Sequence, residues 1–315
     1  SIVAYILSRV VQGSCLGPVL LLIYINDLVD AFGESIISKL YADDVKIYTD
    51  ISLGNCTRSI IQETLNKLER WSIDWQLPIS YLKCCVLRLG IPEIDINSLY
   101  LGQHLLSSVA EMSDLGILID NKLRFSTHIN KIVGRAHKRA NLILRCFTRR
   151  DPVLLMSAFN VYVRPILEYC SIIWNPHLLK DIEAIENVQR RFTKRLPGMQ
   201  NFTYHQRLVS LSLDSLELRR IRLDLIYTYK IVFGLCDLRM TDFFSKATCL
   251  TLRGHRHRLY LPTTRNGARY DFYSHRIIGA WNSLPVEKVN FNSLNSFRNS
   301  LSSDILVYLC KLNFA

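Results

Sequence analysis

Two adjacent carboxylates, Asp43 and Asp44, are the side chains best suited to hold a metal ion. They lie in the middle of residues 38–49, where Leu40, Val45 and other apolar residues alternate with lysine and tyrosine. This alternation predicts a β-hairpin that carries both acids at its tip. Magnesium prefers hard oxygen ligands, and a hairpin tip can present two acids without burying unpaired charge. An ordinary aspartate-rich turn is the other interpretation, and it is the commoner setting for an isolated pair.

Helices and strands alternate around these acids over residues 1–120. An apolar stretch from Val19 to Leu28 predicts a buried helix with Pro18 in its first turn. Residues 56–75 place apolar side chains on one helical face. Strands are expected at residues 84–89, 99–106 and 115–119. The first part of the chain is therefore predicted to be α+β, with antiparallel strands.

Beyond residue 120 the pattern is almost entirely helical. Residues 127–147 combine an apolar face with a basic one that contains Lys131, Arg135, Lys138 and Arg139. A second helical stretch begins at Pro152 and is expected to bend or break at Pro165. Further helices are predicted at residues 181–196 and 216–235, and the tail from Leu252 mixes arginine, tyrosine and turn residues.

The net charge of +12 is unevenly distributed along the chain. Residues 1–120 carry 8 Lys and Arg against 14 Asp and Glu, a net charge of −6. Residues 121–315 carry 31 against 13, a net charge of +18. An acidic block beside a strongly basic one fits a metal-binding centre next to a polyanion track. A generically basic surface is the alternative that charge alone leaves open.

Cysteine usage and hydropathy exclude several protein classes. The nine cysteines show no paired spacing, so we expect reduced thiols, mostly in the core. Cys249, His255 and His257 lack a fourth ligand at the spacing of a zinc site. No apolar run reaches the roughly 18 residues of a spanning helix. We expect a protein that is neither secreted nor in the membrane, located in the nucleus or the cytoplasm, and an incomplete chain because it begins at Ser1.

Four short motifs follow one another in an order that resembles the palm of reverse transcriptases. They are Gln12-Gly13-Ser14, Tyr41-Ala42-Asp43-Asp44, Lys83-Cys84 and Tyr100-Leu101-Gly102. Longer segments are similar to the jockey-like group of non-LTR retrotransposons: QGSCLGPVLLLIYINDL, KLYADDVKIY, WSIDWQLPISYLKCCVL, DLGILID and FSTHINKIV. The similarity continues through VRPILEYCSIIW, IENVQRRFTKRLPG, SLELRR and AWNSLP. It covers nearly the whole chain.

The resemblance implies a role for each matching residue. Asp43 and Asp44 are expected to bind catalytic Mg²⁺, and Lys83 to neutralise or protonate the departing pyrophosphate. The implied nucleotide- and template-binding residues are Gln12, Gly13, Ser14 and Tyr41. The implied primer grip is Tyr100, Leu101 and Gly102. The residues expected to contact nucleic acid are Lys131, Arg135, Lys138, Arg139, Arg190, Arg191 and Lys194. A surface lysine and a solvated helix face remain the alternatives for Lys83 and for the basic helix.

The implied architecture is an incomplete polymerase palm at residues 1–120, a helical thumb at 121–200 and a C-terminal helical region at 201–315. The expected partners are an RNA template, a DNA primer and deoxynucleoside triphosphates, and the oligomeric state is open. The family usually has Gly and Pro before the Gln-Gly loop, where this chain has Arg9 and Val11. The family's other metal-binding Asp lies upstream of Gln12, so we expect the 315-residue chain alone not to extend a primer.

Three interpretations of function are therefore open. The first is part of an RNA-directed DNA polymerase that transfers nucleotides by a two-metal mechanism in the complete protein. The second is a non-catalytic nucleic-acid-binding remnant that keeps the basic helices. The third is the product of a decayed element without a selected function.

Overall fold

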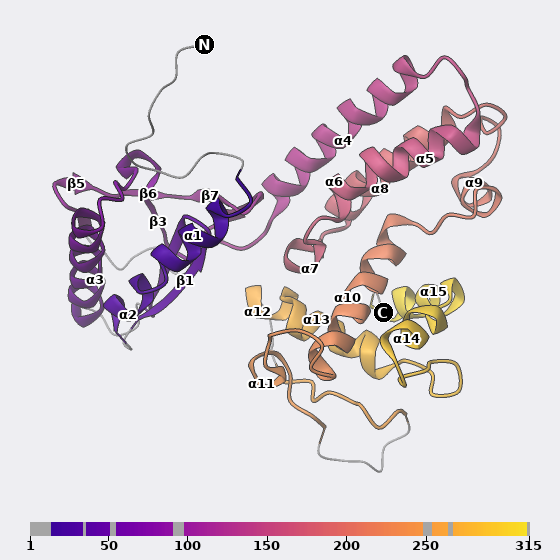
Figure 1. The fold of residues 1–315 in the computed structure, drawn as a ribbon. Helices are drawn as coiled ribbons and strands as arrows, with labels where there is room; N and C mark the ends of the chain where they lie inside the picture. The colour runs from indigo at the N-terminus through magenta and orange to yellow at the C-terminus, as the bar shows by residue number, and fades with distance from the viewer. Residues whose placement is uncertain are drawn as a thin grey trace. The chain divides into compact units, whose positions relative to one another are not determined.

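The computed structural model describes residues 14–33, 36–50, 55–90, 98–247, 254–263 and 267–313. The chain forms two compact units, Ser1–Glu111 and Met112–Ala315, coloured from indigo to yellow along the chain in Figure 1. Helices and small sheets occur together, which is compatible with the predicted α+β class. The division between the units falls before Asp120, where the sequence pattern changes. The assignment of palm, thumb and C-terminal region remains a prediction.

The first unit combines three helices with short strands. Its elements are α1 (Gly17–Tyr24), α2 (Leu28–Phe32), β1 (Ile37–Tyr41), β2 (Asp44–Tyr48), α3 (Asn55–Asp74), a 3-10 helix (Tyr81–Lys83), β3 (Cys85–Leu87), β4 (Tyr100–Leu101), β5 (His104–Leu105) and β6 (Ser107–Val109). Strands β1 and β2 form an antiparallel hairpin, as do β4 and β5. Strand β3 pairs with β6 in parallel, which the sequence pattern did not predict.

The core of the first unit is small and lies between α3 and the strands. Leu65 from α3 packs with Leu99 and Leu101, and Ile47 of β2 packs against the same cluster. The predicted amphipathic helix at residues 56–75 is thus confirmed, with its apolar face inward. The shared cluster fixes the base of the β1–β2 hairpin to α3 and β4.

The prediction of one buried helix from Val19 to Leu28 is wrong in two respects. The helix ends at Tyr24, and a turn separates α1 from α2. Helix α1 has no buried residue, and Leu16 and Ile23 are each 68% exposed. A helix that is apolar on all sides is expected to be buried, but its own sequence does not show which other elements would cover it. Pro18 does lie in the first turn, as expected.

The second unit is mainly helical. It contains β7 (Glu111–Asp114), β8 (Ile117–Asp120), α4 (Ser126–Cys146), α5 (Pro152–Tyr162), α6 (Arg164–Glu168), α7 (Ser171–Trp174), α8 (Leu179–Lys194), α9 (Tyr204–Ser210), α10 (Leu216–Val232), α11 (Met240–Phe243), α12 (Ala268–Asp271), α13 (Tyr273–Asn282), α14 (Leu294–Ser300) and α15 (Ser303–Asn313). The expected break near Pro165 is confirmed between α5 and α6. Four of these helices, α12 to α15, lie beyond Leu252, within the expected C-terminal helical region, although the sequence there mixes arginine, tyrosine and turn residues.

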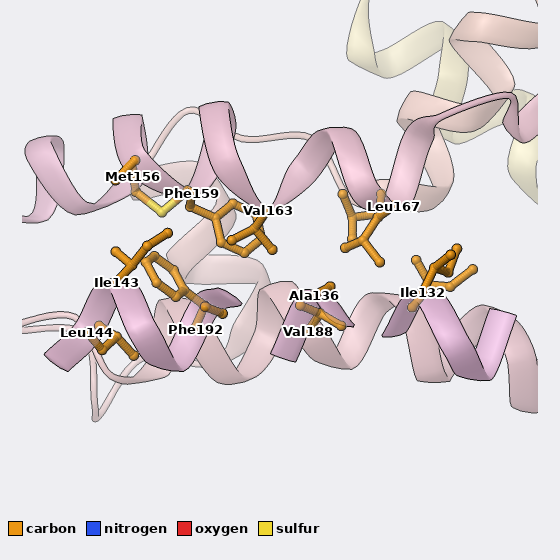
Figure 2. Packing of buried hydrophobic residues seen from close by; sticks show 14 of the residues in the cluster. Ile132, Ala136, Ile143, Leu144, Met156, Phe159, Val163, Leu167, Val188 and Phe192 are labelled. Atoms are coloured by element: carbon orange, nitrogen blue, oxygen red, sulfur yellow. The ribbon is translucent and has the colours of Figure 1, made fainter. Parts of the chain in front are cut away.

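Helices α4, α5, α6 and α8 enclose the first core of this unit. Figure 2 shows Ile143 of α4 close to Phe159 of α5 and Phe192 of α8, and Ile132 of α4 at the other end of the cluster, opposite Leu167 of α6. The Phe159 and Phe192 ring centroids lie 4.7 Å apart. Each of these side chains is almost fully buried, so the core fixes which face of α4 and of α8 remains in solvent.

A second core joins α10, α13, α14 and α15 around Trp281 and Phe297. Beside it, the buried Asp224 Oδ2 accepts hydrogen bonds from Asn175 Nδ2 at 3.0 Å and Arg276 Nη2 at 3.1 Å. Asn175 Oδ1 in turn accepts from Arg220 Nε at 3.0 Å. Removing one partner of such a buried ionic network leaves an uncompensated charge, so these residues are structural.

Mild acid should destabilise the second unit through His128. Its buried ring accepts a hydrogen bond at Nδ1 from Leu118 N, 3.1 Å away, which joins β8 to α4. Burial, and then the charges of Lys131 and Arg135, lower the pKa of His128 from its ordinary 6.5. The pKa of His128 is therefore lower in the folded protein than in the unfolded chain. The neutral ring stabilises the fold fully above about pH 6.5, and this stabilisation is lost as the pH falls toward the pKa of the folded state.

Urea unfolding between about pH 8 and pH 5 measures this effect. The free energy of unfolding should fall below pH 6.5, and His128→Gln should make that fall shallower. The exposed His205 on α9 offers a substitution control, since His205→Gln makes the same chemical change away from β8 and α4. Equal pH profiles for the wild type and the His128 variant would contradict the prediction.

The seven described cysteines are unpaired, as expected, but none of them is buried. Cys84, Cys236 and Cys310 are partly buried and pack against the hydrophobic cores, so the prediction of mostly core positions holds only for these three. Cys15 precedes α1, Cys146 ends α4 and Cys170 precedes α7 with a φ of 50°, so these three lie at element ends that face solvent. Cys56 and Cys249 lie outside the residues whose side chains the structure describes.

Candidate active site and nucleic-acid interface

The two aspartates lie at the tip of the β1–β2 hairpin. Tyr41 pairs with Asp44, so Ala42 and Asp43 form a two-residue loop, in which Ala42 has a φ of 51°. Both aspartates are exposed, and no described residue forms an ion pair with either carboxylate. The predicted hairpin is confirmed, and its two acids are free to meet a cation.

Two carboxylates at one tip fit part of a magnesium coordination shell. Magnesium needs about six oxygen ligands and keeps several of its waters, so one or two protein carboxylates are a common share. Within the described ranges, no cluster of three or more His, Cys, Asp or Glu side chains is placed to bind a metal. A two-metal centre needs further ligands. The hairpin therefore fits one part of such a centre, and the metal-binding role remains a prediction.

The structure describes only some of the other residues that are predicted to take part in catalysis. Gln12 and Gly13 lie outside the described residues. Ser14 Oγ accepts a hydrogen bond from Gly17 N at 3.0 Å, so this side chain organises the start of α1. Lys83 ends the 3-10 helix before β3 and is exposed. No described hydrogen bond or ion pair joins Ser14 or Lys83 to the two aspartates, so their catalytic roles also remain predictions.

The expected primer-grip residues form a second hairpin, β4–β5. Gly102 has a φ of 61° in its turn, and a Cβ atom there would collide with the Glu69 carboxylate. Only glycine adopts this backbone conformation without strain. Leu101 is buried in the same cluster as Ile47, whereas Tyr100 is 43% exposed. The core thus connects this hairpin to the one that carries the acids.

Gln62 of α3 holds the second hairpin in place, and the sequence analysis did not identify it. Its side-chain amide donates to Tyr100 O at 2.7 Å and accepts from Tyr100 N at 2.9 Å. This pairing imitates a neighbouring β-strand and satisfies both backbone groups of Tyr100. Nothing in the sequence distinguishes Gln62 from any other polar residue on a helix, so no signal could have identified it.

A basic face extends over α4 and the C-terminal half of α8. Lys131, Arg135, Lys138 and Arg139 are all exposed on α4, opposite the apolar face that forms the core. Helix α4 contains no Asp or Glu. Arg191, Lys194 and Arg195 are exposed at the end of α8. We call these seven side chains the α4–α8 basic face.

Contacts at both ends of the pair show that α4 and α8 run parallel. Ser126 Oγ donates to Asp181 Oδ2 at 2.6 Å near their starts, and Arg195 Nη1 donates to Asn141 Oδ1 at 2.7 Å near their ends. Between these contacts, burial and then the charge of Arg191 lower the pKa of His137. Arg191 and Arg195 therefore lie next to His137 and Asn141 of α4, so bases from both helices occur in this part of the second unit, which favours contact with phosphates.

Arg190 differs from its neighbours because it contacts Tyr204. Its guanidinium carbon lies 5.1 Å from the Tyr204 ring centroid, and its Nη1 donates to Asn187 Oδ1 at 2.9 Å. Arg207 lies 5.5 Å from the same centroid. Tyr204 therefore packs with two arginines, of which Arg207 is buried. The predicted nucleic-acid contact of Arg190 stays a prediction.

Several known proteins are similar in sequence to this chain. Over 208 residues, 63% of this chain, the sequence is 26% identical to the RNA-directed DNA polymerase from the mobile element jockey of Drosophila funebris. It is 24% identical over 212 residues to a probable RNA-directed DNA polymerase from the transposon X-element of Drosophila melanogaster. An uncharacterised protein of Caenorhabditis elegans is 30% identical over 122 residues. The chain is similar to the RNA-directed DNA polymerases of jockey and of the X-element over about three-fifths of its length.

The chain corresponds to only part of each of these proteins. The chain spans 23% of the length of each of the two named polymerases and 61% of the nematode protein. No protein-family model and no solved structure matches it. Among the described residues, no helix is both long and apolar enough to span a membrane. These matches bear out the resemblance to jockey-like polymerases over about three-fifths of the chain.

Proposed function

We propose that this chain is part of an RNA-directed DNA polymerase of a jockey-like non-LTR retrotransposon, which extends a DNA primer along an RNA template. The observation that carries the proposal is the β1–β2 hairpin, which presents Asp43 and Asp44 to solvent on a base fixed by the core. Similarity to named polymerases over about three-fifths of the chain supports it. The substrates would be deoxynucleoside triphosphates.

In this proposal, Asp43 and Asp44 hold magnesium at the hairpin tip. Magnesium there would activate the primer 3′ oxygen and stabilise the charge on the transferred phosphate. Ile47 keeps the base of the hairpin against α3, so both carboxylates are positioned before substrate binds. Lys83 would supply positive charge or a proton to the departing pyrophosphate. The other metal ligand is proposed to come from a strand upstream of Gln12, as the resemblance implies.

The β4–β5 hairpin and the basic face would position the nucleic acid. The β4–β5 hairpin shares its core with the catalytic hairpin, so it could hold the primer end near the metal ions. The α4–α8 basic face would contact phosphates of the copied duplex without reading sequence, as a copying enzyme requires. Magnesium-dependent primer extension tests the proposal, with Asp43 as the residue to change.

A non-catalytic nucleic-acid-binding protein is the second candidate. The observation that favours it is the α4–α8 basic face, whose side chains are exposed on well-packed helices whatever the state of the catalytic centre. One experimental result distinguishes the two candidate functions. Both bind a duplex with strong salt dependence, but only the polymerase extends a primer.

A further inference from the structure

A separate surface of the second unit is built on residues 254–260. Helix α13 fixes this segment through its last two residues. Asn282 accepts from Leu259 N and donates to Leu259 O, each at 2.8 Å, and Trp281 Nε1 donates to His257 O at 2.7 Å. His255 Nε2 lies 2.8 Å from Trp281 O. Trp281 and Asn282 belong to the AWNSLP motif, so this motif holds residues 254–260 in one conformation. The catalytic proposal assigns no role to this motif.

Burial alternates along the fixed segment. His255 and Leu259 are 4% and 2% exposed, and His257 packs on Phe233 and Phe291. Arg256 is exposed and Tyr260 is 54% exposed. One side of the segment is therefore held in an aromatic core, while Tyr260 is exposed and the exposed Arg256 donates from Nε to His257 Nε2 at 3.4 Å. Because the backbone is already fixed, a ligand would lose little entropy in ordering it.

Helix α12 adds a second tyrosine and another arginine beside this segment. The His275 ring centroid lies 4.8 Å from that of Tyr270, and His275 Nε2 lies 3.2 Å from Pro262 O. His275 thus places Tyr270 close to the chain that follows Tyr260. Tyr270 is 48% exposed and Arg269 is exposed. We call Arg256, Tyr260, Arg269 and Tyr270 the arginine–tyrosine surface.

The sequence around this surface is mostly basic, although Asp271 ends α12 directly after Tyr270. Between Asp242 and Asp271 the sequence has no Asp or Glu, and it has six bases, which are Lys246, Arg253, Arg256, Arg258, Arg265 and Arg269. Exposed aromatic rings interleaved with arginine are the combination that binds unpaired nucleotides, because rings stack on bases and guanidinium groups contact phosphates. Helix α4, in contrast, contains no Phe, Tyr or Trp. It offers cations to phosphates but no phenylalanine, tyrosine or tryptophan ring to bases.

We propose that the arginine–tyrosine surface binds single-stranded nucleic acid, at a site separate from the α4–α8 basic face. Tyr260 and Tyr270 stack on unpaired bases, and Arg256 and Arg269 contact the phosphates on either side. The site requires no magnesium and no catalytic acid, so it does not depend on the proposed polymerase activity. In a polymerase, such a site would hold template that has not yet been copied.

Fluorescence anisotropy tests this proposal with the whole chain and three labelled probes of about 12 nucleotides or base pairs. The probes are oligouridylate, oligothymidylate and a blunt duplex, of which the first two separate RNA from DNA. The variant Tyr260→Ala/Tyr270→Ala should weaken binding of the single strands by about tenfold per ring and leave duplex binding unchanged. Tyr260→Phe/Tyr270→Phe keeps both rings and should bind as the wild type does.

Arg256→Ala should lower the slope of log affinity against log salt by about one for single strands. The exposed Arg298 on α14 gives the matched control, since Arg298→Ala should leave that slope unchanged. Wild-type affinity of the double-alanine variant for both single strands would overturn the proposal. An equal loss of duplex affinity would overturn it too, because the surface would then not be selective for unpaired bases. Neither result would alter the expected primer extension.

Discussion

Primer extension should fall by about a hundredfold or more when Asp43 is replaced by Asn. The carboxamide has nearly the shape of the carboxylate, but it lacks the charge that holds magnesium. Even residues that only support a metal ligand contribute about 10- to 100-fold, so loss of the ligand itself should cost at least as much. The assay uses the whole polypeptide of the reading frame, a DNA primer on an RNA template, and magnesium. Because Asp43 is exposed in a turn, the variant should fold normally.

The matched control is Asp74→Asn, which removes an exposed carboxylate at the end of α3 from the same unit. This variant should extend the primer at the wild-type rate. Comparable extension by the Asp43 variant would show that the hairpin is an ordinary turn. In that case the chain would keep its family relationship, but the proposed metal site would be wrong.

Duplex affinity should fall by roughly tenfold for each phosphate contact removed from α4 at about 0.1 M salt. Each lysine or arginine on a phosphate releases about one counterion, so the double variant Arg135→Ala/Lys138→Ala should also lower the salt slope by about two. Both side chains are exposed opposite the core, so their removal should leave the fold unchanged. Binding of a labelled RNA–DNA duplex across a salt series measures both quantities.

Two exposed basic residues elsewhere in the second unit provide the control. Lys288→Ala/Arg298→Ala makes the same change in net charge, but neither residue belongs to the α4–α8 basic face. The control should lose far less affinity than the α4 variant. Equal losses would mean that affinity follows total charge, and that the face has no particular role.

Patterns with a clear period predicted the fold well. The apolar spacing of residues 127–147 predicted both the extent of α4 and the side chains that enter the core, and Ile132, Ala136 and Ile143 are buried. Alternation around Asp43 likewise predicted the hairpin. In both cases the local backbone geometry decides which side chains share a face. Such features can be obtained from sequence without knowledge of what packs against them.

Features that depend on partners distant in sequence could not be predicted. The apolar run of α1 gave no indication that the helix would be exposed, because burial depends on neighbouring elements. Gln62 acts on Tyr100, 38 residues away, through backbone groups that every residue possesses. Trp281 and Asn282 likewise bind backbone groups of residues that lie 24 and 23 positions away in the sequence. Trp281 and Asn282 lie in the AWNSLP motif, whereas Gln62 lies in none of the motifs, and the physical roles of all three require the structure.

The most direct test of the magnesium proposal is primer extension by an Asp43→Cys variant in magnesium and in manganese. A thiolate is a poor ligand for Mg²⁺, whereas Mn²⁺ accepts softer ligands more readily. If the Asp43 carboxylate binds the catalytic ion, the cysteine variant should be inactive in Mg²⁺ and regain part of its extension in Mn²⁺, relative to wild type in each metal. Extension at the wild-type rate in Mg²⁺ would contradict the account, and so would an equal loss in both metals.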